Sequence, residues 1–247
     1  MTHMITDPRT AHALHYLFEW AALVTGLLVY RSVRRKKRES WLTTPGAFPA
    51  IVGALLGAAV GNKLAFWIDS PQLLSSQAAG WGMLLAGQSI VGGLLGGWLG
   101  VETGKRWAGV RVRTGDDYVL PILSGIVMGR IGCFLAGLND GTYGLPTDLP
   151  WGVDFGDGMP RHPTQLYEIF VASVAMGTWP WWKAAFAHTP GLAFRVMMLA
   201  YLLWRVGVDL LKPVSYAYAW GLSGIQWICI FGSVMIGIGL VRDFRRA

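Results

Sequence analysis

Seven long apolar stretches constrain the fold of this chain more than any other feature of its sequence. They cover roughly residues 13–30, 48–68, 80–102, 117–138, 164–185, 191–211 and 219–241. A helix of about 20 residues is long enough to cross some 30 Å of hydrocarbon. Only 14% of the residues are charged, against about 25% in a typical soluble domain. The sequence therefore predicts an all-α polytopic membrane protein with about seven transmembrane helices.

The connections between these stretches leave no room for a separate soluble domain. We therefore expect residues 1–247 to form a single integral membrane domain. Its longest external connection is residues 139–163, which is rich in Asp, Gly and Pro. A loop of this length is often functional. Within it, Trp151–Phe155 is a short piece that we expect to pair as a small strand.

The distribution of basic residues predicts the orientation of the chain in a membrane. Clusters of Lys and Arg follow the first, third and seventh stretches, at residues 31–38, 105–113 and 242–246. The loops on the opposite side carry only Arg9, Arg161 and Lys212. Because cytoplasmic loops are enriched in Lys and Arg, we expect the N-terminus outside and the C-terminus in the cytoplasm. The net charge of +7 is then a topology signal and does not indicate a nucleic-acid partner.

Charged residues inside the apolar stretches mark the candidate functional site. Arg130 lies within the fourth stretch, where an ionised side chain costs about 2.5–3.5 kcal/mol or more and therefore indicates a function. Tyr201, Arg205 and Asp209 in the sixth stretch are four residues apart, so they share one helix face. An internal Arg205–Asp209 ion pair is the simplest explanation of that pattern. The alternative is that Arg205 faces a polar cavity together with Arg130.

Other residues in the spans have both a structural and a functional interpretation. Glycines recur every four residues in two spans, at Gly53, Gly57 and Gly61 and at Gly92, Gly96 and Gly100. Small residues on one face allow helices to pack closely in lipid, although Gly92 and Gly93 could also admit a lipid chain. Glu19 in the first span is either an interfacial group, a structural hydrogen-bond partner or part of a site.

Residues 129–168 carry a resemblance to a known family. The segment begins with Gly129-Arg130-Ile131-Gly132-Cys133-Phe134 and ends with Pro160-Arg161-His162-Pro163-Thr164-Gln165-Leu166-Tyr167-Glu168. These runs are similar to the Arg-x-Gly-Asn-Phe and Pro-Arg-His-Pro-Ser-Gln-Leu-Tyr-Glu runs of bacterial prolipoprotein diacylglyceryl transferases. The family's Tyr-x-x-x-Arg-x-x-x-Glu run resembles Tyr201 to Asp209. The resemblance follows the span order over nearly the whole chain, with identity concentrated in these short runs.

Several positions depart from the family pattern. Gln88-Ser89-Ile90-Val91-Gly92-Gly93-Leu94 resembles the family's Ser-Phe-His-Gly-Gly-Leu run, but Val91 replaces the histidine and cannot accept a proton. Cys133 stands in place of the family's asparagine, and Leu138 and Thr142 replace a glutamate and an arginine. A buried cysteine is usually a small apolar residue of the core, and the alternative for Cys133 is a covalent nucleophile.

The resemblance implies transfer of a diacylglyceryl group from phosphatidylglycerol to the lipobox cysteine of a prolipoprotein, with release of glycerol phosphate. It implies that two arginines hold the phosphate and that His162 or Asp140 assists deprotonation of the thiol. The candidate catalytic residues are Arg130, Arg205, His162, Tyr201 and Asp209. The candidate substrate-binding residues are Glu19, Gln88, Ser89, Gly92, Gly93, Asp140, Arg161, Gln165, Tyr167 and Glu168. No metal or other cofactor is expected, because no His, Cys and Asp residues have metal-ligand spacing and no phosphate loop occurs.

The expected partners are phosphatidylglycerol, a prolipoprotein and membrane lipids, with no nucleic acid. We expect a monomer in the bacterial inner membrane, with an active site that opens toward the periplasm. One alternative is a paralogue that transfers a lipid group to a different acceptor, and another is a phospholipid-binding membrane protein without turnover. A small-solute transporter is disfavoured because the sequence shows no inverted repeat with paired broken helices.

Overall fold

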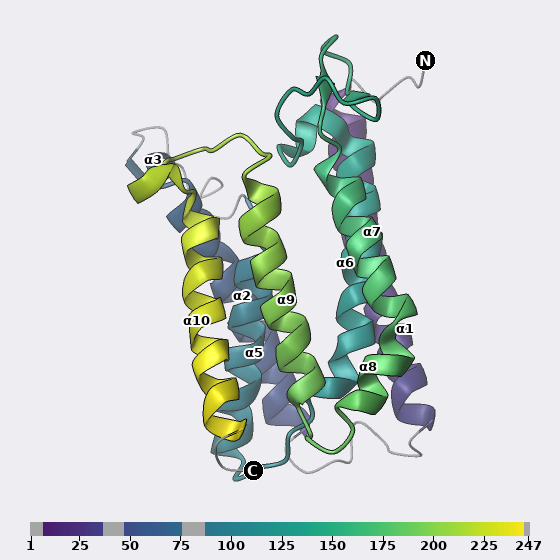
Figure 1. Ribbon diagram of the computed structural model, residues 1–247, viewed down its shortest axis with the longest axis vertical. Coiled ribbons are helices and arrows are strands. Elements are labelled where there is room, and N and C mark those ends of the chain that lie inside the picture. Colours follow the sequence, from purple (N-terminus) through teal and green to yellow (C-terminus); the bar gives the residue numbers. More distant parts are fainter. Residues whose placement is uncertain (1–6, 37–46, 76–86, 245–247) are drawn as a thin grey trace. The chain divides into compact units, whose positions relative to one another are not determined.

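The computed structural model describes residues 7–36, 47–75 and 87–244, which are mostly helical. The long helices in Figure 1 are α1 (Pro8–Lys36), α2 (Ala47–Asp69), α5 (Ile90–Trp107), α6 (Val119–Ala136), α7 (Thr164–Gly177), α9 (Leu192–Asp209) and α10 (Gly224–Phe244). The short elements are α3 (Gln72–Ser75), α8 (Trp179–Ala185), the 3₁₀ turns η1 (Gly115–Tyr118), η2 (Gly137–Asp140) and η3 (Ala219–Gly221), and the strands β1 (Val153–Asp154) and β2 (Pro160–Arg161). The predicted all-α class is confirmed.

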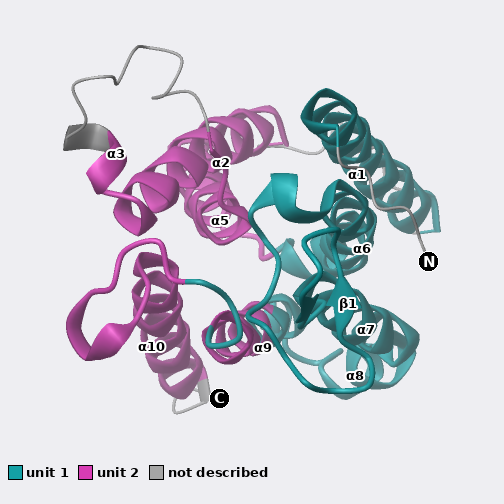
Figure 2. Ribbon diagram, turned by 90° about the horizontal axis from the view of Figure 1, so that it is seen from above, with its two compact units in different colours: residues 1–38, 114–197, 210–213 teal, residues 39–113, 198–209, 214–247 magenta. Residues whose placement is uncertain are grey.

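The chain divides into two compact units, which Figure 2 shows in different colours. Unit 1 comprises residues 1–38, 114–197 and 210–213, and unit 2 comprises residues 39–113, 198–209 and 214–247. Unit 1 contains α1, α6, α7 and α8, whereas unit 2 contains α2, α5, α10 and most of α9. The single membrane domain stays a prediction.

Four helices in the described residues are long and apolar enough to cross a membrane. They are Pro8–Lys36, Ala47–Asp69, Gly115–Asp140 and Gly224–Asp243. The protein is therefore an apolar, helical membrane protein, as expected. Helices α5 and α9 carry more charge, since α5 ends with Glu102, Lys105 and Arg106 and α9 contains two arginines and Asp209. Seven spans and the predicted orientation stay predictions.

Three of the predicted helix boundaries were wrong. The stretch 164–185 is two helices, because α7 ends at Gly177 and α8 starts at Trp179 with Pro180 in its first turn, where a proline that cannot donate is tolerated. The third stretch becomes helical at Ile90, and the part of it before Gly87 lies outside the described residues. The last long helix begins at Gly224, after a separate 3₁₀ turn.

In unit 1, α1 and α6 lie side by side and antiparallel, as contacts at their two ends show. Near the start of α1, His15 meets Asp140, and near its end Arg34 meets Asp117 in a buried ion pair of 3.2 Å. Between them, Gly132 brings the two helices together, because a Cβ at this position would lie 2.4 Å from the Cβ of Phe18. The sequence identified Arg34 only as one of the basic residues that set the orientation. The structure shows that it also forms a buried ion pair with Asp117.

In unit 2, glycines hold α2 against α5. A Cβ on Gly96 would lie 2.2 Å from the carbonyl oxygen of Gly57, and Gly53 and Gly61 oppose Gly100 and Gly92 in the same way. Backbones can approach this closely only where neither helix has side chains between them. The packing interpretation of the glycine repeats is therefore confirmed.

The loop at residues 139–163 contains the expected small strands. β1 and β2 pair antiparallel, with Val153 opposite Arg161 and Asp154 opposite Pro160. The carboxylate of Asp154 accepts hydrogen bonds from the amides of Gly156 and Gly158 at 2.8 and 3.0 Å and closes the turn. These contacts give the loop a defined conformation next to α7.

The turn of this hairpin is expected to be sensitive to acid. The guanidinium of Arg161, whose Nε lies 2.9 Å from Asp157 Oδ2, lowers the pKa of that carboxyl. A carboxyl group whose pKa is lower in the folded state stabilises the fold at pH values above its unfolded-state pKa. This stabilisation is lost as the pH falls through its folded-state pKa. Hydrogen exchange of the β1–β2 amides, corrected for the intrinsic pH dependence, should show a small loss of protection on acidification. The Asp157→Asn variant should lack this loss, and an identical pH profile in that variant would contradict the assignment.

Candidate active site

Arg130 and Glu168 form a buried ion pair in unit 1. Arg130 Nε is 3.0 Å from Glu168 Oε2, and the two side chains are 8% and 2% exposed. Arg130 comes from α6, and Glu168 comes from α7, which packs against it. A buried arginine is tolerated when a carboxylate balances its charge. Both residues were predicted separately as site residues, and the structure brings them together.

The first turn of α7 ties Glu168 to the beginning of the loop. Gln165 Nε2 donates to Thr142 Oγ1 at 3.3 Å, and Thr164 Oγ1 donates to the Thr142 carbonyl at 2.9 Å. The hydroxyl of Thr142 in turn donates to Asp140 Oδ2. Gln165 and Glu168 are both almost fully buried. Thr164, Gln165 and Glu168 therefore lie in the interior of unit 1, whereas Leu166 of the same turn is exposed.

His162 is part of an aromatic cluster with Tyr167 and Trp151 near the first turn of α7. Its Nδ1 lies 3.2 Å from the hydroxyl of Tyr167, which accepts a hydrogen bond from Trp151 Nε1 at 2.9 Å. The imidazole is partly buried and contacts the Tyr167 ring edge-on. Arg161, next to it, points elsewhere, since its guanidinium pairs with Asp157 and lies 5.1 Å from the centre of the Tyr143 ring. Arg161 thus stabilises the loop through its contacts with Asp157 and Tyr143.

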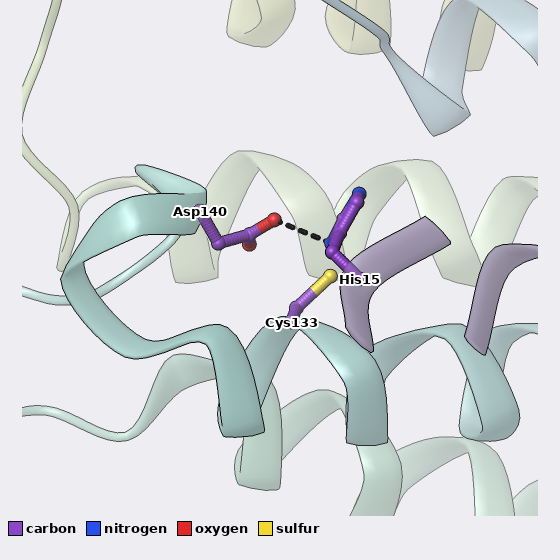
Figure 3. Close-up of side chains that lie close together, drawn as sticks. All are labelled: His15, Cys133 and Asp140. Atoms are coloured by element: carbon purple, nitrogen blue, oxygen red, sulfur yellow. Dashed lines mark ion pairs between the residues drawn. The ribbon is translucent and has the colours of Figure 1, made fainter. Parts of the chain in front are cut away.

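A second polar cluster joins α1 to the end of α6. His15 Nδ1 is 2.8 Å from Asp140 Oδ1, and His15 Nε2 is 3.2 Å from Glu19 Oε1. Figure 3 shows Asp140 and His15 pointing toward each other, with the sulfur of Cys133 beside them. Arg130 Nη1 lies 3.7 Å from this sulfur, so Cys133 connects the cluster to the Arg130–Glu168 pair.

Sequence reasoning missed His15. Its neighbours Cys133 and Asp140 lie far along the chain, and only the four-residue spacing from His15 to Glu19 was visible in the sequence. Of the three interpretations of Glu19, the structure favours the hydrogen-bond partner. Cys133 is buried, as its position in an apolar stretch indicated, but it has polar neighbours.

In unit 2, Arg205 and Asp209 form the predicted internal ion pair. Arg205 Nη2 is 2.9 Å from a carboxylate oxygen of Asp209, and the two side chains are 8% and 7% exposed. Tyr201 is buried on the same helix. Gln226 of α10 donates to the Val206 carbonyl at 3.0 Å and fixes this part of α9 against its neighbour.

The entry to α5 is held by side chains of α2. Ser89 is the N-cap of α5, its hydroxyl accepting from the Gly92 amide at 3.3 Å, and its own amide donates to Asn62 Oδ1 at 2.5 Å. Lys63 Nζ donates to the Gly87 carbonyl at 2.7 Å. Ser89 therefore has a structural role, and its contact with substrate stays a prediction.

The remaining predicted positions in this region differ in their surroundings. Gly92 is buried against α2, where a Cβ would lie 2.2 Å from the Gly61 carbonyl oxygen. At Gly93 a Cβ would meet nothing closer than 3.9 Å, and Gln88 is exposed. Val91, at the family's histidine position, is fully buried. Packing thus accounts for Gly92, while Gly93 and Gln88 are accessible enough to contact a lipid.

The predicted site residues thus fall into two groups. Unit 1 contains Glu19, Arg130, Asp140, Arg161, His162, Gln165, Tyr167 and Glu168, and unit 2 contains Gln88, Ser89, Gly92, Gly93, Tyr201, Arg205 and Asp209. Within each unit several of these residues make polar contacts with one another, and their roles in a substrate site stay predictions. The predicted cooperation of Arg130 with Arg205 involves both units and stays a prediction.

Apolar helices with buried arginine–carboxylate pairs define an integral membrane protein with polar sites in its interior. The sequence model of the prolipoprotein diacylglyceryl transferase family matches residues 11–242. The chain belongs to this family, and it is therefore a transferase of lipoprotein biosynthesis.

Similar proteins carry the name phosphatidylglycerol–prolipoprotein diacylglyceryl transferase. The one from Bordetella parapertussis is 29% identical over 204 residues, covering 78% of this chain and 74% of the relative. The one from Nitratidesulfovibrio vulgaris is 32% identical over 199 residues, covering 77% of this chain and 72% of the relative. The one from Polynucleobacter necessarius is 29% identical over 212 residues, with 80% and 76% coverage.

Proposed function

We propose that this protein transfers the diacylglyceryl group of phosphatidylglycerol to the lipobox cysteine of a prolipoprotein. The thiol sulfur forms a thioether with the glyceryl carbon, the bond from that carbon to the phosphate oxygen breaks, and glycerol phosphate leaves. The observation that carries the proposal is the buried Arg130–Glu168 pair, because both residues lie in runs that match the family. The printed names of the relatives give the same donor and acceptor.

Arg130 is suited to bind the phosphate. A guanidinium binds phosphate through paired, charge-assisted hydrogen bonds. Glu168 contacts the Nε side of Arg130 at 3.0 Å and thereby fixes the plane of the guanidinium. In a site shielded from water, donors fixed in this way stabilise the charge that develops on a leaving phosphate. Glu168 then acts by positioning Arg130.

Arg205 is proposed as a second phosphate ligand, positioned by Asp209 and Tyr201. The Arg205–Asp209 contact of 2.9 Å fixes this guanidinium as Glu168 fixes Arg130.

Asp209→Asn is expected to lower the rate of diacylglyceryl transfer about tenfold or more, because the carboxylate that orients Arg205 loses its charge. Asp209→Glu restores the residue type of the family and should stay within a few-fold of the natural protein. Initial rates with thermal melts of both variants would check this, and equal losses in the two would contradict the positioning role.

The thiol of the acceptor must lose its proton. Val91 is fully buried and offers no base, while Asp140 is already engaged by His15 and Thr142. This arrangement favours His162 over Asp140 as the assisting group. A free thiol has a pKa near 8.5, and a neighbouring cation lowers it, so the positive charge of Arg130 would contribute to ionisation.

The finer predictions from the sequence belong to the same proposal. We propose lipid contacts at Gln88, Ser89, Gly92 and Gly93 and contacts to the substrates at Gln165 and Tyr167. The protein acts as a monomer in the bacterial inner membrane, with its site open toward the periplasm. A different acceptor is the second candidate function, because Val91 and Cys133 replace residues of the family pattern.

Release of glycerol phosphate tests the proposal. Purified protein in detergent is mixed with phosphatidylglycerol and either a lipobox peptide or the same peptide with serine in place of its cysteine. The proposal predicts release that depends on the cysteine peptide. Release that is independent of the peptide would indicate hydrolysis or another acceptor. Retention of lipid without any release would instead indicate a lipid-binding protein.

A further inference from the structure

The cluster of His15, Cys133 and Asp140 contains the ligand types of a transition-metal site. His15 comes from α1, Cys133 from α6 and Asp140 from the following turn η2. One nitrogen, one sulfur and one oxygen from these residues all lie within 4.8 Å of one another. Figure 3 shows the side chains of His15, Cys133 and Asp140 close together. Three such atoms are the usual protein ligands of an open zinc site.

Each of the three side chains also has an outer partner. His15 Nε2 lies 3.2 Å from Glu19 Oε1, which leaves Nδ1 directed at Asp140. The second oxygen of Asp140 accepts a hydrogen bond from Thr142. The sulfur of Cys133 lies 3.7 Å from Arg130 Nη1. A carboxylate on the second ring nitrogen of a ligating histidine is typical of metal sites, because it fixes the ring and raises its basicity.

The local charge favours a cation at this position. Asp140 and Glu19 flank His15, and their side chains are 5% and 30% exposed. Glu168 is also close by, but Arg130 neutralises it. Two carboxylates thus flank one imidazole beside the sulfur of Cys133, and uncompensated charge is costly where it is buried. Either a proton on His15 or a divalent ion provides the balance.

The three ligand atoms, which lie within 4.8 Å of one another, must shift to bind a cation. Zinc bonds of about 2.0–2.2 Å to nitrogen and oxygen require the Nδ1–Oδ1 distance to open moderately from 2.8 Å. A set of imidazole, thiolate and carboxylate suits zinc, whereas magnesium and calcium prefer oxygen alone. We propose that His15 Nδ1, Cys133 Sγ and Asp140 Oδ1 bind a zinc-like divalent cation that clamps α1 to the end of α6. This site goes beyond the proposed transfer reaction and does not depend on it.

Cobalt is the appropriate probe, because its absorbance reports both geometry and sulfur ligation. Purified protein, stripped with a chelator and kept reduced, is titrated with Co²⁺. One equivalent should give a thiolate-to-cobalt charge-transfer band and the visible bands of a tetrahedral ion, and Zn²⁺ should displace both. Cys133→Ser should abolish the charge-transfer band, and Asp140→Asn should weaken binding. Glu19→Gln should weaken Co²⁺ binding about 10–100-fold with the bands retained, as for an outer partner.

The chain offers a matched control in its second cysteine. Cys229 is buried in α10 of unit 2, so Cys229→Ser should bind Co²⁺ like the natural protein. Zn²⁺ should also raise the melting temperature of the natural protein and of Cys229→Ser, but not of Cys133→Ser. Absence of the charge-transfer band, the same band in Cys133→Ser, or binding well below one equivalent would overturn the proposal and indicate an adventitious ion only.

Discussion

Arg130→Lys is expected to reduce diacylglyceryl transfer on the order of 10²–10³-fold while the protein still folds. Lysine keeps the positive charge that balances Glu168, so the buried carboxylate retains a partner. It lacks the planar fork that binds phosphate through two hydrogen bonds. The measurement is the initial rate of peptide lipidation at saturating phosphatidylglycerol, with thermal melts and size-exclusion profiles to confirm folding.

The matched control is Arg113→Lys. Arg113 pairs with Asp243 at 2.8 Å in unit 2, and its side chain is 50% exposed, so the same chemical change is made at an exposed arginine–carboxylate pair. Its rate should equal that of the natural protein. A folded Arg130→Lys variant with a near-normal rate would show that Arg130 has only a structural role.

Gly96→Ala is expected to lower the free energy of unfolding by about 3 kcal/mol or more. This is the upper end of the range that is typical when a side chain is added to a well-packed contact. The added Cβ would lie 2.2 Å from the Gly57 carbonyl oxygen and 2.9 Å from the Gly61 Cα. Because both are backbone atoms, α2 and α5 must move apart to accommodate it. Thermal melts in one detergent provide the measurement.

The adjacent glycine supplies the control for this change. A Cβ on Gly97 would lie 3.5 Å from the Cβ of Ala58, which is ordinary van der Waals contact. Gly97→Ala should therefore change stability by no more than about 0.5 kcal/mol. Similar melting temperatures for the two variants would mean that the glycine contact does not determine how α2 packs against α5.

Local patterns in the sequence predicted an ion pair within one helix and the helix faces that pack closely. The Arg205–Asp209 pair follows from four-residue spacing, and the glycine repeats on α2 and α5 predicted a close helix contact. Helix ends were less predictable, because hydropathy continues through Thr178 while the backbone starts a new helix there. The apolar character of a stretch thus predicted the presence of helix but not where each helix ends.

Which polar side chains meet across two helices could not be predicted from spacing. Arg130 and Glu168 were each identified through their motifs, but their 3.0 Å contact depends on how far α7 is shifted along α6. His15 has no motif of its own, and its role appears only when α1 places it beside Cys133 and Asp140. Such contacts are set by packing and by the loop between the helices, neither of which can be read from residue spacing.

The mass of a lipobox peptide after incubation tests the central claim most directly. The peptide, phosphatidylglycerol and purified protein are incubated, and the modified residue is located by fragmentation mass spectrometry. Transfer predicts one diacylglyceryl group on the cysteine sulfur, formed by the natural protein and not above background by Arg130→Lys. An unmodified peptide, under conditions in which a family relative modifies it, would contradict transfer to a prolipoprotein thiol.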